Sequence, residues 1–597
     1  MKHFTALWLL ATLLTLIPLT LSAADATGAN AFSISRSSAD GIQLHFELPA
    51  WKLEDVKQGD RTLQRVSVAD APYIFINETE TLPVFATMVA IPYSGSASLN
   101  ILGSQQQNRS VVNLDFNSIL SHERSAGKYT AALYPANSAL ISEPQVIRDF
   151  RVITVNIYPF QYDQQTGQLI VKQSMDLRID FNNDPAWGDV APPTAYSQAF
   201  EPIYKGLIIN YEAAINRTLS YTNPRMLVIY GNFSDPIYLA KVNEYVAWKK
   251  QKGFVVNSVS TATTGTSNTA IKTYIQTQYD NVSTRPDYIV LIGDSGSGSM
   301  QVPTYGTYTD YYYTWLNGGD SLGDVIIGRI SVENTDQMII YMAKVASLEK
   351  NLNLNTASWL NKMVLVGDTA HSGISTIYTS EYIEDIASAV NPAYTYTEEF
   401  NGSPSNSNVN TAINNQGVAF YNYRGYIGMS GWPSYISQLS NQYKLFHAVI
   451  ITCATGNFSG GDATTETVVR QGTAANLGGA ITAIGMATSS TATPQNNCLD
   501  AGIFHSIYSW GARDMGTAML YGKLYLNAVY GTSAPTEAAN FAAYCNLIGD
   551  PTAEVYVGIP STFNVSAPAS IPSGASNVEI TVRNANNEII SDASVSL

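Results

Sequence analysis

The feature that most limits the possible folds of this chain is a regular alternation of apolar strand-like runs and helical stretches between residues 225 and 560. The alternation begins with residues 226–230, 236–252, 254–259, 268–279 and 288–294, and it continues to 479–485. Strands that are apolar at every position are typical of parallel sheets buried on both faces. The pattern therefore predicts an α/β domain over 225–560, with a mostly parallel sheet that is covered by helices.

Residues 25–185 show a different pattern and predict a β domain. Apolar and polar residues alternate with period two at 42–48, 151–157 and 175–181, and residues 164–168 have the composition of a hairpin turn. Short strands of this kind are typical of a β-sandwich. No group of titratable residues in this part indicates chemistry, so we expect the functional site in the α/β domain.

The segment 186–224 between these two parts reads as a linker. It contains Pro192, Pro193, Arg217 and Pro224, and Arg225 follows it directly. Such composition is typical of an exposed connection that a peptidase can cleave.

Residues 561–597 return to a β pattern. The stretches 563–566 and 578–582 alternate like the first strands of an immunoglobulin-type sandwich. A sandwich of that type needs about seven strands, and two or three fit here. We therefore expect a truncated immunoglobulin-like tail.

The first 24 residues have the pattern of a secretory signal peptide. A basic start at Lys2 precedes the apolar stretch 4–21, and the small residues 22–24 offer a cleavage site. The stretch is long enough for a membrane anchor, but Pro18 and the small-residue exit favour a cleaved signal. No second apolar run of about 18 residues follows. We expect a chain that is secreted or held at the cell surface, with no membrane span after cleavage.

The charge and the cysteines narrow the functional classes. The formal net charge is −15 and no basic patch stands out, which argues against nucleic-acid binding. Three cysteines, Cys453, Cys498 and Cys545, allow at most one disulfide and leave one free thiol. The chain has neither a Cys-x-x-Cys nor a His-x-x-x-His spacing, so the sequence does not predict a structural zinc site. Structural calcium in loops has no motif to support it, and the sequence does not set the oligomeric state.

Chemistry-bearing residues follow several predicted strands of the α/β domain. In an open α/β sheet, ligands bind beyond the carboxyl ends of the strands. Asp294, Asp368, the segment 423–426 and Cys453 all stand at such ends. For Asp294 and Asp368, capping of the next helix is the alternative role. Arg424 could bind a carboxylate or pair locally.

Cys453 follows the apolar run 447–452 and precedes the small-residue turn 454–457. A thiol held at the end of a buried strand, with room in front of it, is well placed to act as a nucleophile. A free cysteine is also often a buried small hydrophobic residue. The segment by itself leaves both interpretations open.

Five short motifs in the α/β part occur together in one order. They are Tyr-Ile-Val-Leu-Ile-Gly-Asp at 288–294, Asp-Val-Ile-Ile-Gly-Arg-Ile at 324–330, Asn-Tyr-Arg-Gly-Tyr at 422–426, Ile-Ile-Thr-Cys-Ala-Thr-Gly-Asn at 450–457 and Gly-Asp-Pro at 549–551. In sequence and order they resemble the motifs of the gingipain-type cysteine peptidases. The resemblance implies a caspase-like α/β catalytic domain at 225–560, a propeptide-like domain at 25–185 and an immunoglobulin-like module at the end of the chain.

The resemblance also implies roles for individual residues. Cys453 falls on the nucleophile, and Asp324 falls on the acidic residue that orients the catalytic base. Gly425 lies in the loop that would help the amide of Cys453 to form the oxyanion hole. The implied reaction is hydrolysis of peptide bonds in peptides or proteins, and it requires no cofactor.

The chain departs from the family pattern at the base itself. The family has histidine directly after the glycine of that loop, and this chain has Tyr426. Cysteine attack needs a thiolate, and a phenol with a reference pKa of about 10 accepts a proton poorly at pH 7. The sequence therefore leaves two hypotheses: a secreted cysteine endopeptidase, or a weak or inactive homologue that acts as a peptide-binding, adhesion or surface-assembly module.

Another histidine could replace the missing base. His371 is the candidate, because it lies in the loop 368–373 after a predicted strand, on the carboxyl side of the sheet. His447 is six residues before Cys453 on the same strand, hence roughly 20 Å away at about 3.3 Å per residue. His505 reads as a packed helix residue. The aromatic residues Tyr308, Tyr311, Tyr312, Tyr313 and Trp315 could line a cleft or serve as packing anchors.

Overall fold

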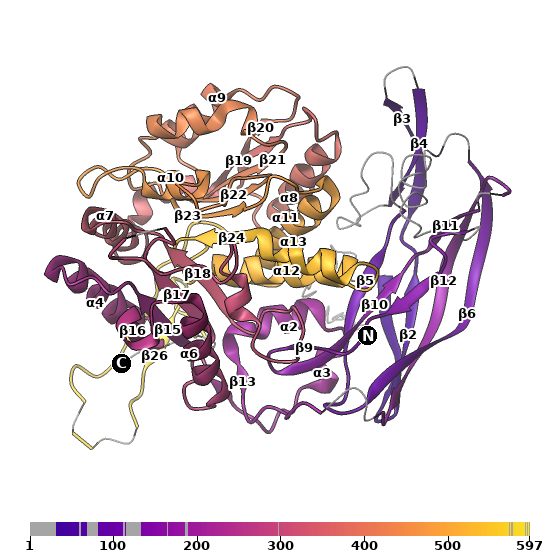
Figure 1. The fold of residues 1–597 in the computed structure, drawn as a ribbon, viewed down its shortest axis with the longest axis horizontal. Coiled ribbons are helices and arrows are strands. Elements are labelled where there is room, and N and C mark those ends of the chain that lie inside the picture. Colours follow the sequence, from indigo (N-terminus) through magenta and orange to yellow (C-terminus); the bar gives the residue numbers. More distant parts are fainter. Residues whose placement is uncertain are drawn as a thin grey trace, which may run out of the picture.

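The computed structural model describes residues 31–58, 61–68, 82–111, 114, 133–163, 165–184, 189–296, 298–571, 573–574, 577–591, 593 and 595. The predicted signal peptide at 1–24 lies outside the described residues. Figure 1 shows an N-terminal lobe of strands beside an α/β lobe with a large central sheet, and the end of the chain lies on the α/β lobe.

The N-terminal lobe contains two antiparallel sheets that face each other. One sheet has the order β1 (Phe32–Ser38), β2 (Gly41–Glu47), β12 (Gln168–Asn182), β11 (Phe160–Asp163) and β7 (Leu133–Tyr134), with β6 (Ser96–Ser110) also paired to β12. The other is formed by β5 (Phe85–Ala90), β10 (Phe150–Ile157), β8 (Ala139–Ile141) and β9 (Gln145–Ile147). Buried side chains of β2, β5, β10 and β12 fill the space between the sheets. The hairpin of β3 (Trp51–Gln58) and β4 (Arg61–Val68) extends from this lobe.

Strand β10 is buried on both faces. Ile153, Val155 and Ile157 point into the sandwich, whereas Phe150 and Val152 belong to a core that is shared with the α/β lobe. The period-two pattern of 151–157 therefore predicts the strand correctly, but its second face lies against the other lobe and does not meet water. Asn156 on that face donates a hydrogen bond to the carbonyl of Ala528 at 2.9 Å.

The expected exposed linker is wrong for most of its length. Residues 196–222 form β13 (Tyr196–Ser197), the 3₁₀ turn η4 (Gln198–Phe200), α2 (Glu201–Leu207), α3 (Tyr211–Ala214) and β14 (Tyr221–Thr222). Phe200, Ile203 and Tyr204 are fully buried in the core between the lobes. Their large apolar side chains stabilise the segment there, since each removes substantial apolar area from water. Arg217, near the end of the segment, is exposed.

The central sheet has ten strands. Their order is β16 (Val255–Ser260), β15 (Arg225–Tyr230), β17 (Tyr288–Ile292), β18 (Ile326–Ile330), β24 (Cys545–Ile548), β23 (Ala480–Met486), β22 (Phe446–Ile451), β21 (Phe420–Arg424), β19 (Lys362–Gly367) and β20 (Thr395–Glu399). Every neighbouring pair is parallel except β23 with β24, which is antiparallel. The sheet thus consists of two parallel halves that run in opposite directions. The prediction of a mostly parallel sheet is confirmed, but the sequence did not reveal this reversal.

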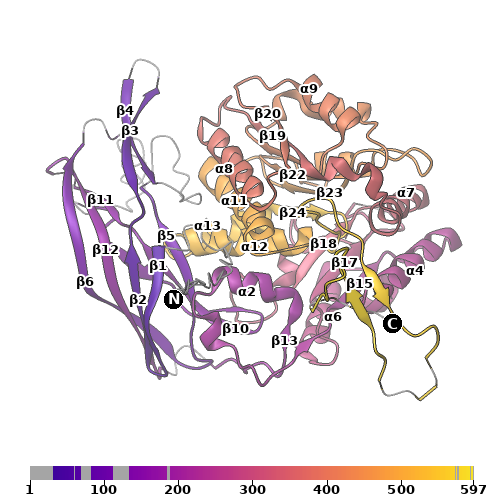
Figure 2. The ribbon, with the colours of Figure 1, turned by 180° about the vertical axis from the view of Figure 1, so that it is seen from behind.

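Helices cover both faces of the sheet. They are α4 (Pro236–Gln251), α5 (Thr261–Thr264), α6 (Asn268–Asp280), α7 (Thr335–Val345), α8 (Ser375–Val390), α9 (Asn406–Thr411), α10 (Thr464–Arg470), α11 (Thr493–Tyr508), α12 (Met515–Tyr530) and α13 (Pro535–Tyr544). Shorter helical segments are η5 (Tyr311–Thr314), η6 (Ala346–Lys350), η7 (Leu354–Asn361), η8 (Ala412–Gln416) and η9 (Met429–Gln438). Helix α12 lies between the N-terminal lobe and the central sheet, where it contacts β5, β10 and β18 (Figure 2).

The end of the chain adds little structure. Strands β25 (Asn564–Ser566) and β26 (Thr581–Arg583) form an antiparallel pair. This pair does not identify a sandwich, so the immunoglobulin-like tail stays a prediction. In the part of the chain that the structure describes, no helix combines the length and the hydrophobicity needed to cross a membrane.

Candidate active site

Cys453 lies just beyond the carboxyl end of β22, and hydrogen bonds to both neighbouring strands fix its position. On one side, the Thr452 hydroxyl donates to the Gly425 carbonyl at 2.9 Å, which ties the turn to the loop after β21. On the other side, the amide of Ala454 donates to the Thr488 carbonyl at 2.8 Å. The sulfur is therefore held where the ends of three parallel strands meet.

The small residues after Cys453 are required by the tight turn. Ala454 has a φ of 57°, which is left-handed backbone. A Cβ atom on Gly456 would lie 2.5 Å from the Gly485 carbonyl oxygen, so no larger residue fits there. Thr455 is buried, and its hydroxyl donates to the carbonyls of Ile450 and Thr452. This network explains the small-residue stretch that the sequence shows at 454–457.

Cys453 is also the most accessible thiol. All three cysteines are free, and Cys498 and Cys545 are completely buried whereas Cys453 is half-buried. Burial raises the pKa of Cys545 to about 11 and raises the pKa of Cys498 still further. No disulfide forms, and Cys453 is the thiol that a substrate can reach.

Gly425 lies in a crowded position between two loops. A Cβ atom there would lie 2.6 Å from the Tyr423 hydroxyl and 2.7 Å from Cβ of Asp368, so the position requires glycine. The hydroxyls of Tyr423 and Ser430 both donate to the Asp368 carboxylate, which also accepts the amide of Ala370. Asp368 thus joins the loop after β19 to the loop after β21. These contacts do not show Asp368 capping the next helix.

The predicted substitute base lies beside Tyr426. The ring centroids of His371 and Tyr426 are 4.8 Å apart. Both side chains are exposed, Tyr426 to 44%. Because β21 lies between β19 and β22, the loops that carry His371, Tyr426 and Cys453 follow three adjacent strands. Tertiary structure therefore brings the predicted residues of these loops to one edge.

Asp324, predicted to orient the catalytic base, is hydrogen-bonded to backbone amides. It is fully buried, and its carboxylate accepts the amides of Leu316 at 2.8 Å, Asn317 at 2.7 Å and Arg148 at 3.2 Å. Burial, assisted by the charge of Asp320, raises the pKa of Asp324 to about 8. These contacts link the α/β lobe to the N-terminal lobe, and none of them involves Tyr426. The base-orienting role of Asp324 stays a prediction from the resemblance.

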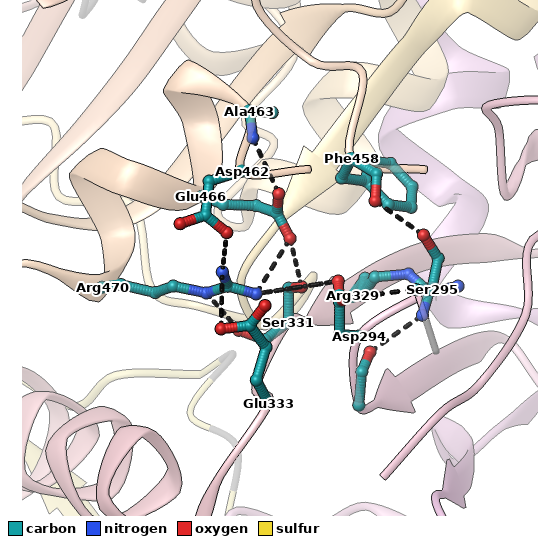
Figure 3. Close-up of polar contacts among 12 residues, drawn as sticks. Asp294, Ser295, Arg329, Ser331, Glu333, Phe458, Asp462, Ala463, Glu466 and Arg470 are labelled. Atoms are coloured by element: carbon teal, nitrogen blue, oxygen red, sulfur yellow. Dashed lines mark hydrogen bonds and ion pairs between the residues drawn. The ribbon is translucent and has the colours of Figure 1, made fainter. Parts of the chain in front are cut away.

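Asp294 does not belong to this edge. Because β17 and β18 run opposite to β22, their carboxyl ends lie near the amino end of β23. There, Arg470 of α10 contacts four carboxylates, namely Asp294 at 3.7 Å, Glu333 at 3.4 Å, Glu466 at 3.0 Å and Asp462 (Figure 3). Ser331 donates a hydrogen bond to Glu466. Burial raises the pKa of Glu466 to about 7.

Two residues near Cys453 were missed or left open by the sequence. Arg424 is fully buried and donates to the side-chain oxygen of Asn497 at 2.8 and 2.6 Å, so it pairs locally. Burial lowers the pKa of Arg424 to about 10, whereas the charges of Asp500, Tyr423 and Cys453 raise it. Thr491 was not singled out, although its hydroxyl lies 2.9 Å from the Cys453 sulfur. The sequence signal that could have identified Thr491 is the hydroxyl-rich run directly after β23.

The remaining candidates are packing residues. His447 contacts Thr482 and the Glu554 carbonyl, and burial lowers its pKa to about 4. His505 is buried in α11, and burial lowers its pKa to about 3, as expected for a packed helix residue. In the aromatic cluster, Tyr311 and Tyr313 are buried, and Tyr313 donates to the Pro303 carbonyl at 2.8 Å. No described group of three or more His, Cys, Asp or Glu residues is arranged to hold a metal ion.

Two family models match the chain, one over each lobe. The model of Peptidase family C25 matches residues 219–556, and the model Propeptide_C25 matches residues 30–219. Gingipain R2 of Porphyromonas gingivalis is 22% identical over 445 residues, which are 70% of this chain and 59% of that protein. Lys-gingipain W83 of the same organism is 25% identical over 414 residues, 63% of this chain and 23% of that protein. The chain thus spans less than two thirds of the length of these curated relatives.

Solved structures show the same fold. The crystal structure of the Arg specific cysteine proteinase gingipain R aligns with a TM-score of 0.54 at 20% identity, over 60% of this chain and 84% of that one. The complex of the pro- and mature domains of RgpB from Porphyromonas gingivalis aligns with a TM-score of 0.53 at 20% identity, over 60% and 86% of the two chains.

Proposed function

Because the chain belongs to peptidase family C25, we propose that it is a secreted cysteine endopeptidase that hydrolyses peptide bonds through Cys453. One observation carries the proposal. Cys453 is the accessible thiol of the three, and it stands at a strand end beside the glycine loop of the neighbouring strand. The substrates would be peptides or proteins, and the reaction needs no cofactor.

The proposed reaction has two stages. The Cys453 thiolate attacks the peptide carbonyl carbon, the carbon–nitrogen bond breaks, and the leaving amine takes up a proton. Water then attacks the thioester, which releases the carboxylic acid and restores the thiol. The amide of Cys453 and an amide of the loop around Gly425 would donate to the oxyanion of each tetrahedral intermediate.

For the proton we propose His371. An imidazole titrates near neutral pH, so it can accept a proton from the thiol and return it to the leaving amine. The contact between the His371 and Tyr426 rings supports this role, because Tyr426 occupies the position where the family motif has its histidine. The hydroxyl of Tyr426 could hold the imidazole or donate to the substrate.

The test uses the full chain with two matched variants, Cys453→Ala and Cys498→Ala. We expect a peptidyl chloromethyl ketone to add one label to the wild type and to Cys498→Ala, and none to Cys453→Ala, as read by intact mass. Peptide hydrolysis should follow the same pattern, since Cys498 is buried and takes no part. Hydrolysis that persists in Cys453→Ala would refute the proposal.

Tyr426 also supports a second function, a homologue that binds peptides without cleaving them. A site without an imidazole at this position would keep its thiol but lack an efficient base. On this hypothesis the wild type binds peptides but shows no turnover, and Tyr426→His creates turnover. Peptide cleavage by the wild-type chain would exclude it.

We further propose export through residues 1–24, with the N-terminal lobe acting as a propeptide-like domain. The match to Propeptide_C25 supports the second part, and the exposed Arg217 offers a site for cleavage. Terminal sequencing of the chain from the culture medium would test both parts. A product that starts at Met1 would refute signal cleavage, and one that starts near residue 25 would show export without propeptide removal.

A further inference from the structure

The sulfur of Cys453 has one close polar neighbour among the described residues. The Thr491 hydroxyl oxygen lies 2.9 Å from Sγ, and the Thr491 carbonyl oxygen lies at 3.9 Å. Thr491 is half-buried in the connection between β23 and α11. Its hydroxyl is therefore well placed to influence whether the sulfur is a thiol or a thiolate.

Asn496 sets the direction of that hydroxyl. Its side-chain amide donates to the Thr491 hydroxyl oxygen at 2.8 Å. A hydroxyl has one hydrogen and two lone pairs. Because the amide of Asn496 takes one of the two lone pairs, the single hydrogen of Thr491 is free to point at the sulfur.

Asn496 is held in this orientation at a cost. Its side chain is 3% exposed, and its amide oxygen is buried without a partner in the part of the chain that the structure describes. A buried polar atom without a partner lowers stability. The opposite orientation would accept the hydrogen of Thr491 and leave the sulfur to donate. The two orientations have opposite effects on the thiol.

One buried cation interacts with Cys453. The buried Arg424 guanidinium of β21 is close enough for its charge to interact with Cys453, and a neighbouring cation favours a thiolate. Asp500 of α11 accepts a hydrogen bond from Asn422 at 2.8 Å, and its charge acts on Arg424. Neither residue is hydrogen-bonded to the sulfur, so Thr491 is the group in direct contact.

We propose that Thr491 donates a hydrogen bond to the Cys453 sulfur and thereby stabilises the thiolate, with Asn496 as the positioning residue that fixes the direction of the bond. The inference rests on the proposed function, in which Cys453 is the nucleophile. A hydrogen bond to a charged acceptor is stronger than one to the neutral form. Thr491 thus supplies, at the sulfur, part of the thiolate stabilisation that an imidazolium gives in a cysteine–histidine pair.

The experiment measures the rate of Cys453 alkylation by iodoacetamide from pH 5 to pH 10 on the full chain, read by intact mass. The inflection of this profile reports the thiol pKa, and the two buried cysteines should not react. Thr491→Val removes the hydroxyl at nearly constant shape and should raise the inflection by about one to two pH units. Thr491→Ser keeps the hydroxyl and should restore the wild-type profile. Asn496→Ala should raise the inflection by a smaller amount.

Either of two results would overturn the inference. An unchanged inflection in Thr491→Val would show that the hydroxyl does not act on the sulfur. A lowered inflection would show that the thiol is the donor and that Asn496 has the opposite orientation. If Thr491→Val does not fold, as judged by thermal unfolding, Asn496→Ala decides: a raised inflection supports the inference, and an unchanged or lowered one refutes it.

Peptide hydrolysis by the same proteins separates this inference from the proposed function. A raised inflection in Thr491→Val, in a protein that never cleaves peptides, would refute the proposed function and keep the hydrogen bond. Normal cleavage by the wild type together with an unchanged inflection would keep the proposed function and refute this inference alone.

Discussion

At one edge of the central sheet, where β19, β21 and β22 end, the side chains of His371, Tyr426 and Cys453 are exposed or half-buried. At the opposite edge, where β17 and β18 end, Asp294 and its neighbours are joined by Arg470. Both edges carry polar groups at the carboxyl ends of parallel strands. The difference is that the carboxylates of the second set are joined by one cation, whereas the His371 and Tyr426 side chains of the first set are exposed.

The edge that carries Cys453 also has left-handed backbone at several residues other than glycine. His371, Met429, Ser430 and Ala454, which follow β19, β21 and β22, all have positive φ values between 46° and 61°. Left-handed backbone at residues other than glycine costs free energy and is concentrated at functional sites. The Cys453 edge thus combines left-handed backbone with side chains that are exposed or half-buried. Polar residues at a strand end become a candidate site where the fold leaves them accessible.

The sharpest test of this comparison is His371→Asn. Asparagine tolerates the left-handed backbone at 371 but cannot serve as the base. We expect kcat/KM for a peptide substrate to fall by about 100- to 10,000-fold, with an unchanged thermal unfolding temperature. Tyr426→Phe is the matched control, because it keeps the ring contact. An unchanged kcat/KM in His371→Asn would remove His371 from the reaction.

The opposite edge should respond in stability. Arg470→Met removes the cation beside Glu466, which is 1% exposed, and should lower the free energy of unfolding by about 3 kcal/mol. Asp462 and Glu333 are much more exposed, so their contacts add little. Urea denaturation measures the change. Arg217→Met, at an exposed position, should change stability by less than about 0.5 kcal/mol. Equal losses for the two variants would contradict the structural role of Arg470.

The same edge should make stability depend on pH. The pKa of Glu466 in the folded chain, about 7, lies above its ordinary value of 4.5. The folded state therefore binds the proton more tightly, so the stabilising contribution is complete below about pH 4.5 and is lost as the pH rises through 7.

We expect the Glu466→Gln variant to lack this decline. The slopes of the free energy of unfolding against pH can differ between the variant and the wild type by about 1.4 kcal/mol per pH unit for one proton. Urea unfolding at pH 5, 6, 7 and 8 would show it. Parallel pH profiles for the two proteins would mean that Glu466 does not titrate in this range.

The smallest expected effect concerns the turn at Cys453. Ala454→Gly relieves the left-handed backbone, which outweighs the added freedom of the unfolded chain, so stability should rise by up to about 1 kcal/mol. The identical change at Ala240, exposed within α4, should lower stability by about 1 kcal/mol. Thermal unfolding of both variants tests the contrast. A loss of stability in Ala454→Gly would mean that the turn is not strained.

Much of the site followed from local sequence. The apolar run before Cys453 predicted a buried strand, and the small residues after it predicted a turn, because both depend on neighbouring residues. The position of His371 after a strand predicted that it lies at the carboxyl edge of the sheet, where it follows β19. Thr491 and Asn496 could not be found this way, since their relation to the sulfur depends on how the connection after β23 folds back on the turn of β22.

The N-terminal lobe shows the same limit. Alternation at 151–157 predicted β10, but an alternating pattern does not distinguish a face that meets water from one that meets another lobe. The segment 196–222 looked like a linker because its prolines and polar residues suggest exposure. Its aromatic side chains find a core only when both lobes are present.

The sequence by itself determined the alternation of strands and helices in the α/β part, the β pattern of the N-terminal part and the candidate thiol at a strand end. Periodicity and turn chemistry act over a few residues, so they can be read directly. Only the tertiary structure decided the direction of the two half-sheets. Strand β24 comes last of the sheet strands in the chain, yet it inserts between β18 and β23 and pairs antiparallel with β23. That long-range pairing separates Asp294 from Cys453, and no local pattern encodes it.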